Sequence, residues 1–570
     1  MVMKPNKKIL ILGLFLTCSN IYAQISTNET PVSFGLDQKQ IDDFRRSTPT
    51  ITTPKLDMMM IAKEDEEDEK YDMPPRFGYP HKVNVNLNNS GVWKELSNGD
   101  KLWLLNVVCP DAVSINFLYD KFWIPDGGKL FVYSKDGSRS IGAFTNRNNK
   151  GSREDVRGFA TGLVYGNDVI LEYYQPKEAT FNAVISIEYI VHGYRYINVG
   201  GKSLGDSGSC MVNINCEEGQ NWQNEKNAVA MILVNGHRCC TGSLINTTNL
   251  SQEPFLLTAN HCIEDDGDAE GNTNLDFYSF YWNYEAPGCA NTSVEPTIYS
   301  TSGATILANC YYSDFALLRL SEDPCCLSGF TPFYLGWDRS GQSGSAGVGI
   351  HHPRGDVKKI STVVSQPIST GYYLYSEDLN ETHWKVLWQS TTNGHGTTEK
   401  GSSGSPLLNG THRLIGQLHG GYADCNDSIS APDWYGKFDV SWSNGYFFST
   451  YRRLNCWLDS LNTGLQTMEG LLVIPSTKTM NSNQQLYSNI HIKNGGQLTI
   501  QSNITLMGNS QLIVESGGTL IIDGGALSNV DLTLKAGAYL HILNGGIIVI
   551  KNKFEATVGA TVDIDSGQIL

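Results

Sequence analysis

Short apolar runs separated by turn-forming residues make up most of the chain, a pattern typical of β-strands rather than long helices. Between residues 78 and 202 the turns include Pro125–Gly128, and this spacing predicts a small β-sandwich. Residues 203–463 have short apolar strands with Gly, Asn and Ser turns, which favours an antiparallel β-barrel. The clearest strands expected in the sandwich are Lys101–Val108, Ser114–Tyr119, Lys129–Tyr133 and Asp168–Tyr173.

The last hundred residues have a different rhythm, in which very short apolar strands alternate with Asn-Gly-Gly or Ser-Gly-Gly turns. Each strand is too short to bury its apolar face alone, so a stacked β-solenoid is predicted for residues 464–570. This region has no cysteine, and we interpret it as an appended module. Its role could be export, surface attachment or glycan binding, and its residues do not select one of these. The expected strands are Leu498–Ile500, Ile504–Leu506, Leu512–Val514, Leu520–Ile522, Leu532–Leu534, Leu540–Ile542 and Ile547–Ile550.

The N-terminal 77 residues divide into two parts. Lysines precede the apolar run Ile9–Thr17, and Ala23 follows it, which is the pattern of a secretory signal over residues 1–23. That run is too short for a transmembrane segment, so we expect a secreted protein. Residues 24–77 contain the acidic run Glu64–Glu69, which predicts a solvated or loosely ordered leader.

Composition narrows the function classes. The 570 residues are enough for two to four domains, and the formal net charge of -16 argues against a nucleic-acid partner. Thirteen cysteines in an exported chain predict several disulfides. A zinc site is the alternative, but the cysteines lack paired C-x-x-C spacing. We therefore expect neither a metal nor a cofactor.

Three residues in chain order have the local sequences of a catalytic triad. His261 ends an apolar run beside a cysteine, Asp314 opens another apolar run, and Ser403 lies in a turn of small residues. Such chemistry needs a hydroxyl nucleophile, an imidazole base and a carboxylate that fixes the imidazole tautomer. The glycine-rich turn would let the Gly401 and Ser403 amides point at a developing oxyanion. Each residue alone could equally be a surface or capping group.

The motifs resemble the trypsin-like, chymotrypsin-fold serine proteases, and most closely the secreted bacterial lysyl endopeptidases. The resemblance implies a double antiparallel β-barrel, protein and peptide substrates, and the disulfides Cys240–Cys262, Cys210–Cys425 and Cys216–Cys289. The remaining cysteines, Cys109, Cys239, Cys310, Cys325, Cys326 and Cys456, stay unassigned. The motifs that carry the resemblance are Cys240–Ile245, Leu257–Cys262, Gly208–Cys216, Tyr281–Tyr284, Gly336–Arg339, Ile350–Pro353, Gly416–Gly421 and Asp433–Gly436.

The resemblance also assigns the residues that contact substrate. Asp433 is implied as the acid that pairs with a substrate lysine, although it could instead cap a turn after Pro432. His419 is implied to line the cleft, where the family stacks it on a tryptophan and Gly371–Tyr375 here offers tyrosine. Because arginine differs from lysine in length and donor geometry, arginine or mixed basic specificity is the alternative.

Activation is the last inference from the sequence. Ser402 has no charge to pair with a new N-terminal amine, so trypsin's activating ion pair is not expected. Lys202 lies in a glycine-rich junction, which predicts self-cleavage there and release of the sandwich as an intramolecular inhibitor. Two other functions are possible from the sequence: an inactive exported adhesin that binds surfaces through the solenoid, and a zinc hydrolase on His351 and His352. Adjacent strand histidines face opposite sides, which disfavours the second.

Overall fold

The structure is a computed structural model of the chain. Among the described residues, no helix has both the length and the apolar character needed to span a bilayer. The predicted signal segment and Lys202 lie outside the described residues. The structure describes residues 29–70 apart from 38–40, 42, 43 and 45, and residues 73–195, 207–263, 274–291, 296, 299–327, 329–373, 381–443 and 452–570.

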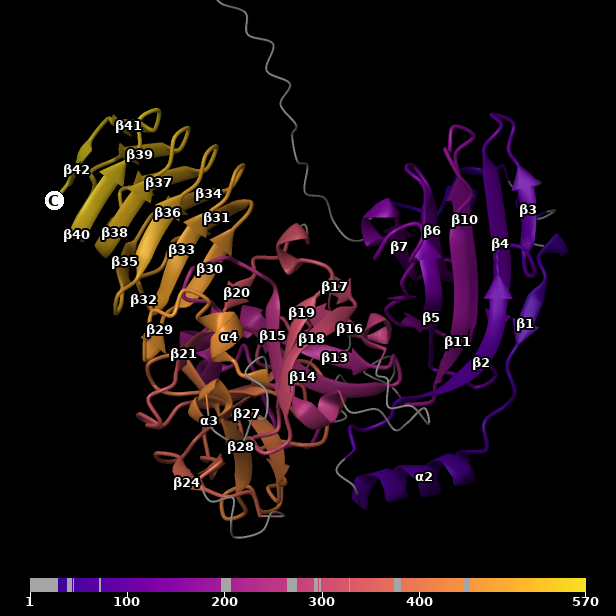
Figure 1. Cartoon of the computed structure of the whole chain (residues 1–570), viewed down its shortest axis with the longest axis horizontal. Coiled ribbons are helices and arrows are strands. Elements are labelled where there is room, and N and C mark those ends of the chain that lie inside the picture. Colours follow the sequence, from indigo (N-terminus) through magenta and orange to yellow (C-terminus); the bar gives the residue numbers. More distant parts are fainter. Residues whose placement is uncertain are drawn as a thin grey trace, which may run out of the picture.

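The N-terminal domain consists of two sheets, at the right of Figure 1, that enclose one apolar core. Strand β4 contributes Trp103 and Leu105 to this core and β5 contributes Phe117 and Tyr119, all fully buried. One sheet contains β1 (Thr50–Thr52), β3 (Val92–Glu95), β4 (Lys101–Val108), β6 (Lys129–Ser134), β7 (Ser140–Phe144) and β10 (Asp168–Gln175). The other contains β2 (Gly78–Asn86), β5 (Ser114–Trp123), β8 (Phe159–Ala160), β9 (Val164–Tyr165) and β11 (Val184–Gly193).

The leader is more ordered than its composition indicates. Strand β1 pairs in parallel with β4, and the acidic run lies in helix α2 (Met58–Lys70). Asp57 accepts hydrogen bonds from the first amides of this helix, and Ile61 is 1% exposed. The sequence predicts a solvated or loosely ordered leader; the acidic run is helical and partly exposed, and three contacts join its carboxylates to arginines of other segments.

Two antiparallel sheets form the segment that contains the three candidate catalytic residues. The first is ordered β17-β16-β13-β14-β15-β19-β18, and the second β12-β23-β22-β26-β27-β28-β25-β24, with β21 beside β27. The first sheet contains β13 (Val229–Val234), β14 (Arg238–Leu244), β15 (Phe255–Ala259), β16 (Ser279–Trp282), β17 (Tyr299–Ser302), β18 (Ala304–Cys310) and β19 (Phe315–Leu320). The second contains β12 (Val212–Asn213), β21 (Gly336–Asp338), β22 (Val348–His351), β23 (Lys359–Thr362), β24 (Ile368–Thr370), β25 (His383–Val386), β26 (Pro406–Leu408), β27 (Arg413–Gly421), β28 (Asp433–Lys437) and β29 (Thr467–Met468).

The few helices are short. Besides α2, the helices with fully described bounds are α3 (Phe438–Ser443), α4 (Asn455–Leu458) and the 3-10 helices η1 (Val32–Gly35), η2 (Asn146–Asn148), η3 (Glu217–Trp222), η4 (Glu225–Ala228), η5 (Asn260–Cys262), η6 (Leu275–Phe277), η7 (Pro324–Cys326) and η8 (Pro353–Gly355).

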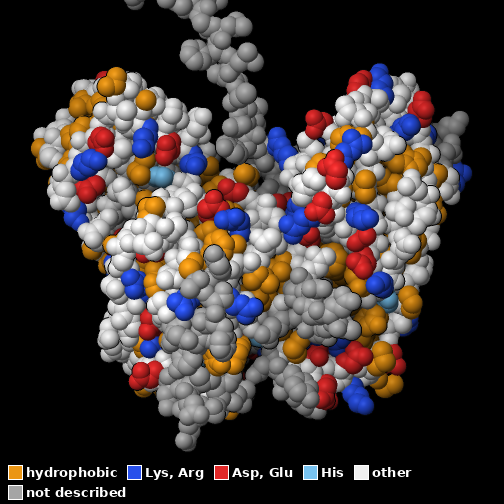
Figure 2. All heavy atoms as spheres, viewed as in Figure 1, with side chains coloured by type: hydrophobic (Ala, Val, Ile, Leu, Met, Phe, Trp, Pro, Cys, Tyr) orange, Lys and Arg blue, Asp and Glu red, His pale blue; other side chains and the backbone are white. Residues whose placement is uncertain are grey.

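The C-terminal region is a β-solenoid in which each strand pairs in parallel with a strand about one turn further along the chain. Inward residues such as Leu498, Leu520 and Leu540 stack in register and are fully buried. Hydrophobic side chains gather at its far end, upper left in Figure 2. Val558, between the last strands of the solenoid, is 96% exposed. The strands are β30 (Gly470–Ile474), β31 (Thr477–Met480), β32 (Gln484–Leu486), β33 (Ser488–Ile492), β34 (Gln497–Ile500), β35 (Asn503–Leu506), β36 (Gln511–Val514), β37 (Thr519–Asp523), β38 (Ala526–Leu534), β39 (Tyr539–Leu543), β40 (Gly546–Ala556), β41 (Thr561–Ile564) and β42 (Gly567–Ile569).

The solenoid is joined to the preceding segment by strand pairing. Strand β20 (Phe333–Tyr334) pairs with β30, the first strand of the solenoid, and β21 pairs with β29. Arg413 forms an ion pair with Glu469 at this junction, with 2.5 Å between nitrogen and oxygen. The predicted all-β class with a C-terminal β-solenoid is confirmed.

Candidate active site

Strand register brings His261 and Asp314 together. Strands β15 and β19 are antiparallel neighbours in which Ala259 pairs with Phe315, so the residues just beyond this pair are adjacent. His261 Nδ1 lies 2.8 Å from Asp314 Oδ2, and the His261 amide donates to the other carboxylate oxygen at 3.0 Å. The Asp314 carboxylate thus fixes the His261 ring through Nδ1 and the His261 backbone through its amide. It does not contact the other ring nitrogen, Nε2.

The backbone around Asp314 is held in an uncommon conformation. Asp314 has φ of 50°, in the left-handed region, which costs about 1 kcal/mol or more for a residue with a side chain. The Gln417 side-chain amide donates to the Ser313 carbonyl at 2.6 Å, and the Asn260 backbone amide donates to the Asp314 carbonyl at 3.1 Å. Burial raises the pKa of Asp314, and the neighbouring His261 opposes that rise.

The turn around Ser403 is fixed on both sides of the serine. Gly401 and Gly404 have φ of 95° and 82°, and a Cβ on Gly401 would approach the Arg354 amide and the Cys239 sulfur. Ser402 Oγ lies 2.8 Å from His351 Nδ1, and the Thr241 amide donates to the Ser403 carbonyl at 2.8 Å. An uncharged buried contact therefore anchors Ser402.

The turn also leaves two donors available. Within the described part of the chain, the amides of Gly401 and Ser403 have no hydrogen-bond acceptor, whereas the Ser402 amide donates to the Glu399 carbonyl. Two such amides, two residues apart and next to a half-buried Ser403 side chain, can both bind one oxygen anion.

Ser403 and Asp433 line the same cavity, which has a volume of about 770 Å³. Asp433 is 1% exposed, and its Oδ2 accepts hydrogen bonds from Trp388 Nε1 and Thr398 Oγ1, both at 2.7 Å. Its Oδ1 lies 3.3 Å from the Ala423 amide. Burial raises the pKa of Asp433 to about 6, although these hydrogen bonds favour the charged form.

His419 also lines the cavity, and its ring stacks on Tyr372 with centroids 3.6 Å apart. Tyrosine thus provides the aromatic contact expected near position 372. The other edge of His419 faces buried groups: its Nε2 lies 3.8 Å from Asp314 Oδ2, and its Nδ1 lies 3.0 Å from His383 Nε2.

The segment that contains His261, Asp314 and Ser403 is similar to known proteins. Residues 204–436 match the family model described as lysyl endopeptidase, C-terminal domain. A lysyl endopeptidase of Pseudomonas aeruginosa is 32% identical over 254 residues, which is 42% of this chain and 51% of the relative. The resemblance to lysyl endopeptidases is confirmed. The chain spans about half the length of this curated relative.

Solved protease structures resemble part of the chain at low sequence identity. A Glu endopeptidase in complex with MPD is 16% identical, with 42% of this chain and 92% of the other covered and a TM-score of 0.25. A thermostable serine protease from an extremophilic microorganism is 15% identical, with coverages of 38% and 92% and the same TM-score.

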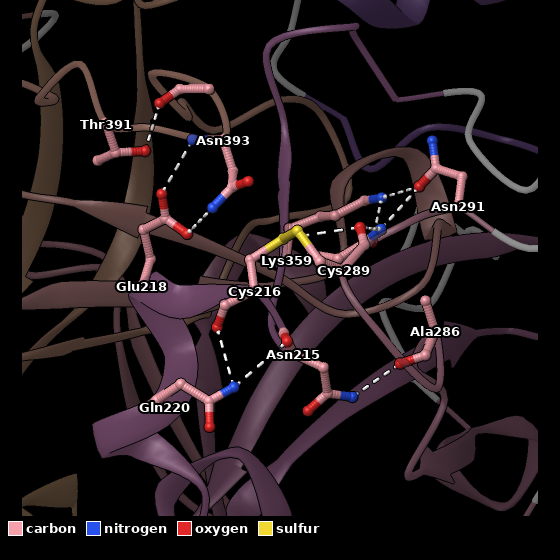
Figure 3. Close-up of a disulfide and its surroundings, with 12 residues drawn as sticks. Asn215, Cys216, Glu218, Gln220, Ala286, Cys289, Asn291, Lys359, Thr391 and Asn393 are labelled. Carbon is pink, nitrogen blue, oxygen red and sulfur yellow. Dashed lines mark hydrogen bonds between the residues drawn. A yellow bond between two sulfur atoms is a disulfide. The ribbon is translucent and has the colours of Figure 1, made fainter.

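The segment similar to lysyl endopeptidases contains three disulfides, Cys210–Cys425, Cys216–Cys289 and Cys240–Cys262, which are the pairs that the resemblance implies. Near the second bond, the Asn215 side-chain amide donates to the Ala286 carbonyl at 2.7 Å (Figure 3). The third joins β14 to η5, next to His261. Cys456 stays unassigned. Five other cysteines form no disulfide with a described residue: Cys109, Cys239, Cys310, Cys325 and Cys326.

Two features of the lysyl endopeptidase-like segment were missed in the sequence. His383 contacts His419 because β25 and β27 flank β28, and no motif marks that contact. Met73 and Pro75 line the same cavity as Ser403, although they precede the sandwich. The Pro74–Pro75 pair was a usable signal, since two prolines favour an extended chain that can lie in a groove.

Proposed function

We propose that the protein is a secreted serine endopeptidase that cleaves after lysine through an acyl-enzyme. Ser403 acts as the nucleophile, His261 as the general base, and Asp314 as the carboxylate that orients His261. The observation that carries the proposal is the 2.8 Å contact between His261 and Asp314, beside a turn with two available amides.

The chemistry follows from these contacts. His261 donates Nδ1–H to Asp314, so Nε2 is the nitrogen that takes the Ser403 hydroxyl proton as Oγ attacks the substrate carbonyl carbon. The carbonyl oxygen becomes an anion that the Gly401 and Ser403 amides stabilise. His261 then gives the proton to the leaving amine, and water repeats the sequence to hydrolyse the ester.

Lysine specificity is assigned to Asp433 because a bound ammonium needs a buried partner charge. Arginine or mixed basic specificity is the alternative. A matched pair of peptides that differ only in lysine or arginine before the cleaved bond tests it: the proposal requires a higher kcat/KM for lysine. Labelling of Ser403 by a fluorophosphonate tests the catalytic role itself, and an unlabelled processed protein would favour the adhesin alternative.

The pKa of Asp433 predicts how binding depends on pH. Because the pKa is raised to about 6, the carboxylate is charged above pH 6 and becomes neutral below it. Butylammonium, a competitive inhibitor that mimics the lysine side chain, should therefore bind about tenfold more weakly per pH unit below 6. Its inhibition constant on the processed protease measures this. Neutral butanol is the control, and equal pH dependence for both would contradict the assignment.

We infer that residues Met73–Phe77, called the strap, make the N-terminal region an inhibitor of the same protease. The strap links α2 to β2, and its Arg76 forms an antiparallel bridge with Arg238, the first residue of β14. The Cys239 amide donates to the Pro75 carbonyl at 3.2 Å, and Arg238 Nη1 donates to the Pro74 carbonyl at 2.7 Å. A bound substrate and the strap would compete for this cavity.

Charge contacts hold the strap in position. Arg76 Nε lies 2.9 Å from Asp65 and 3.2 Å from Asp68, and its Nη1 lies 3.0 Å from Glu64, all on α2. Arg238 of the protease segment contacts the same Asp68 at 3.0 Å. Helix α2, at the lower right of Figure 1, thus links the strap and the cleft edge through one set of carboxylates.

Replacing Arg76 with alanine should raise the activity of the unprocessed chain. Removing one partner of a partly buried charge cluster costs about 2 kcal/mol. This corresponds to an increase of about 30-fold in the fraction of molecules whose cleft is not covered by the strap. The measurement is hydrolysis of a small lysyl substrate by the Lys202→Gln chain, with and without Arg76→Ala. Lys82→Ala, which loses an exposed ion pair in the same region, is the control. Equal latent activity in all three chains would refute the inhibitory role.

A further inference from the structure

A chain of buried polar groups extends from Thr382 to the candidate triad. Thr382 Oγ1 lies 2.8 Å from His383 Nδ1, and His383 Nε2 lies 3.0 Å from His419 Nδ1. His419 Nε2 then faces Asp314 Oδ2 at 3.8 Å. His383 and Thr382 are at most 1% exposed, so water does not compete for these contacts.

Only one direction of hydrogen bonding suits this chain. Two imidazole nitrogens 3.0 Å apart share a single proton. If His419 donates it, His419 Nε2 presents a lone pair to the Asp314 carboxylate, which is repulsive. If His383 donates it, the Thr382 hydroxyl donates to His383 Nδ1, and His419 carries its proton on Nε2, facing the carboxylate. The negative charge of Asp314 selects the second arrangement.

Strand order explains why these groups meet. Strands β25 and β27 both pair with β28, and His383 and Gln417 both pair with Gly436, so they flank a residue that has no side chain. A Cβ on Gly436 would lie 1.8 Å from the Ser313 carbonyl, next to Asp314. His419 lies at the irregularity in β27 between Leu418 and Gly420, which turns its ring toward Asp314 and onto Tyr372.

We propose that His383 is a positioning residue for the triad: it sets the tautomer of His419, whose N–H then stabilises the ionised carboxylate of Asp314. This proposal rests on the function proposed above. Asp314 needs such a donor because burial disfavours its charge, and burial also keeps His383 and His419 neutral by lowering their pKa values. His383 touches no substrate and acts only through His419.

The titratable groups around Asp314 and His419 come from several elements. Asp314 is faced by His261 from η5 and by His419 from β27, and it also influences the Cys310 thiol on β18. His419 is faced by His383, Tyr372 and His261. Lys437 on β28 lies over the Trp384 ring instead, 4.4 Å from its centroid.

The test compares His383→Phe, which cannot donate, with His383→Gln, whose side-chain amide can. His383→Phe should lower kcat/KM for a lysyl substrate about tenfold, the effect of losing one donor to a charged group. The acidic limb of its pH profile should move to higher pH, because a less stabilised carboxylate holds the proton of the His261 imidazolium more strongly. His383→Gln should restore kcat/KM to within about threefold of wild type and return the acidic limb to its wild-type position.

Two further measurements separate the possible outcomes. His541→Gln, on the distant solenoid strand β39, is the matched control and should behave as wild type. If wild-type protein hydrolyses no lysyl substrate and a fluorophosphonate leaves Ser403 unlabelled, the proposed function fails. If wild type is active and His383→Phe keeps its kcat/KM and acidic limb, the positioning role is overturned. A lower melting temperature with an unmoved acidic limb also overturns it, since that is a purely structural effect.

Discussion

Ser403→Ala lowers kcat by about 10⁵- to 10⁶-fold, the largest effect that we expect from any single replacement. Without Oγ no ester forms, so His261 has no hydroxyl proton to accept and only binding and the two amides remain to act on substrate. Hydrolysis of a lysyl peptide measures the loss. A His261→Ala, Ser403→Ala double variant should be no slower, because residues that act as one unit do not add.

The same variant tests self-maturation. If the enzyme cuts its own chain after Lys202, Ser403→Ala stays unprocessed when no other protease is present, and N-terminal sequencing reports this directly. Full processing of the variant would rule out self-cleavage. Ser430→Ala is a suitable control because this exposed serine donates its hydroxyl to Asp427 of its own loop.

Asp433→Asn lowers kcat/KM for a lysyl substrate by about 10³-fold, the second largest effect expected. The substrate ammonium would enter a buried site without a partner charge, which costs about 3–5 kcal/mol. Trp388 and Thr398 would still contact the side chain, so the cavity keeps its shape.

The control is Asp424→Asn, at an exposed acid that lines the same cavity. Its charge is screened by water, so we expect a change of less than about threefold. Fluorophosphonate labelling of Ser403 should be unaffected in both variants. If the two replacements lower kcat/KM equally, the general charge of the cleft determines lysine binding and Asp433 has no special role.

Features that are determined by residues close together in the sequence could be predicted from it. The solenoid strands were predictable because each turn has the same apolar spacing and glycine turns, as the register of Leu498, Leu520 and Leu540 shows. His261, Asp314 and Ser403 each lie in a distinctive local sequence. The three disulfide pairs came from the resemblance alone, since spacing between cysteines cannot pair them.

The missed features depend on contacts between segments that are distant in sequence. Thr382 and His383 follow no motif, and their role arises only when β28 places them across from His419. The acidic run in α2 has the composition of a solvated segment, and nothing near it in sequence indicates that Arg238, about 170 residues later, pairs with Asp68. Charge density alone does not reveal whether partners exist.

The pairing of β20 with β30 has a mechanical consequence. Because main-chain hydrogen bonds join the solenoid to the preceding segment, the solenoid extends from it as a rigid arm and is not attached through a flexible linker. Anything fastened at its tip would hold the cleft at one distance and one orientation.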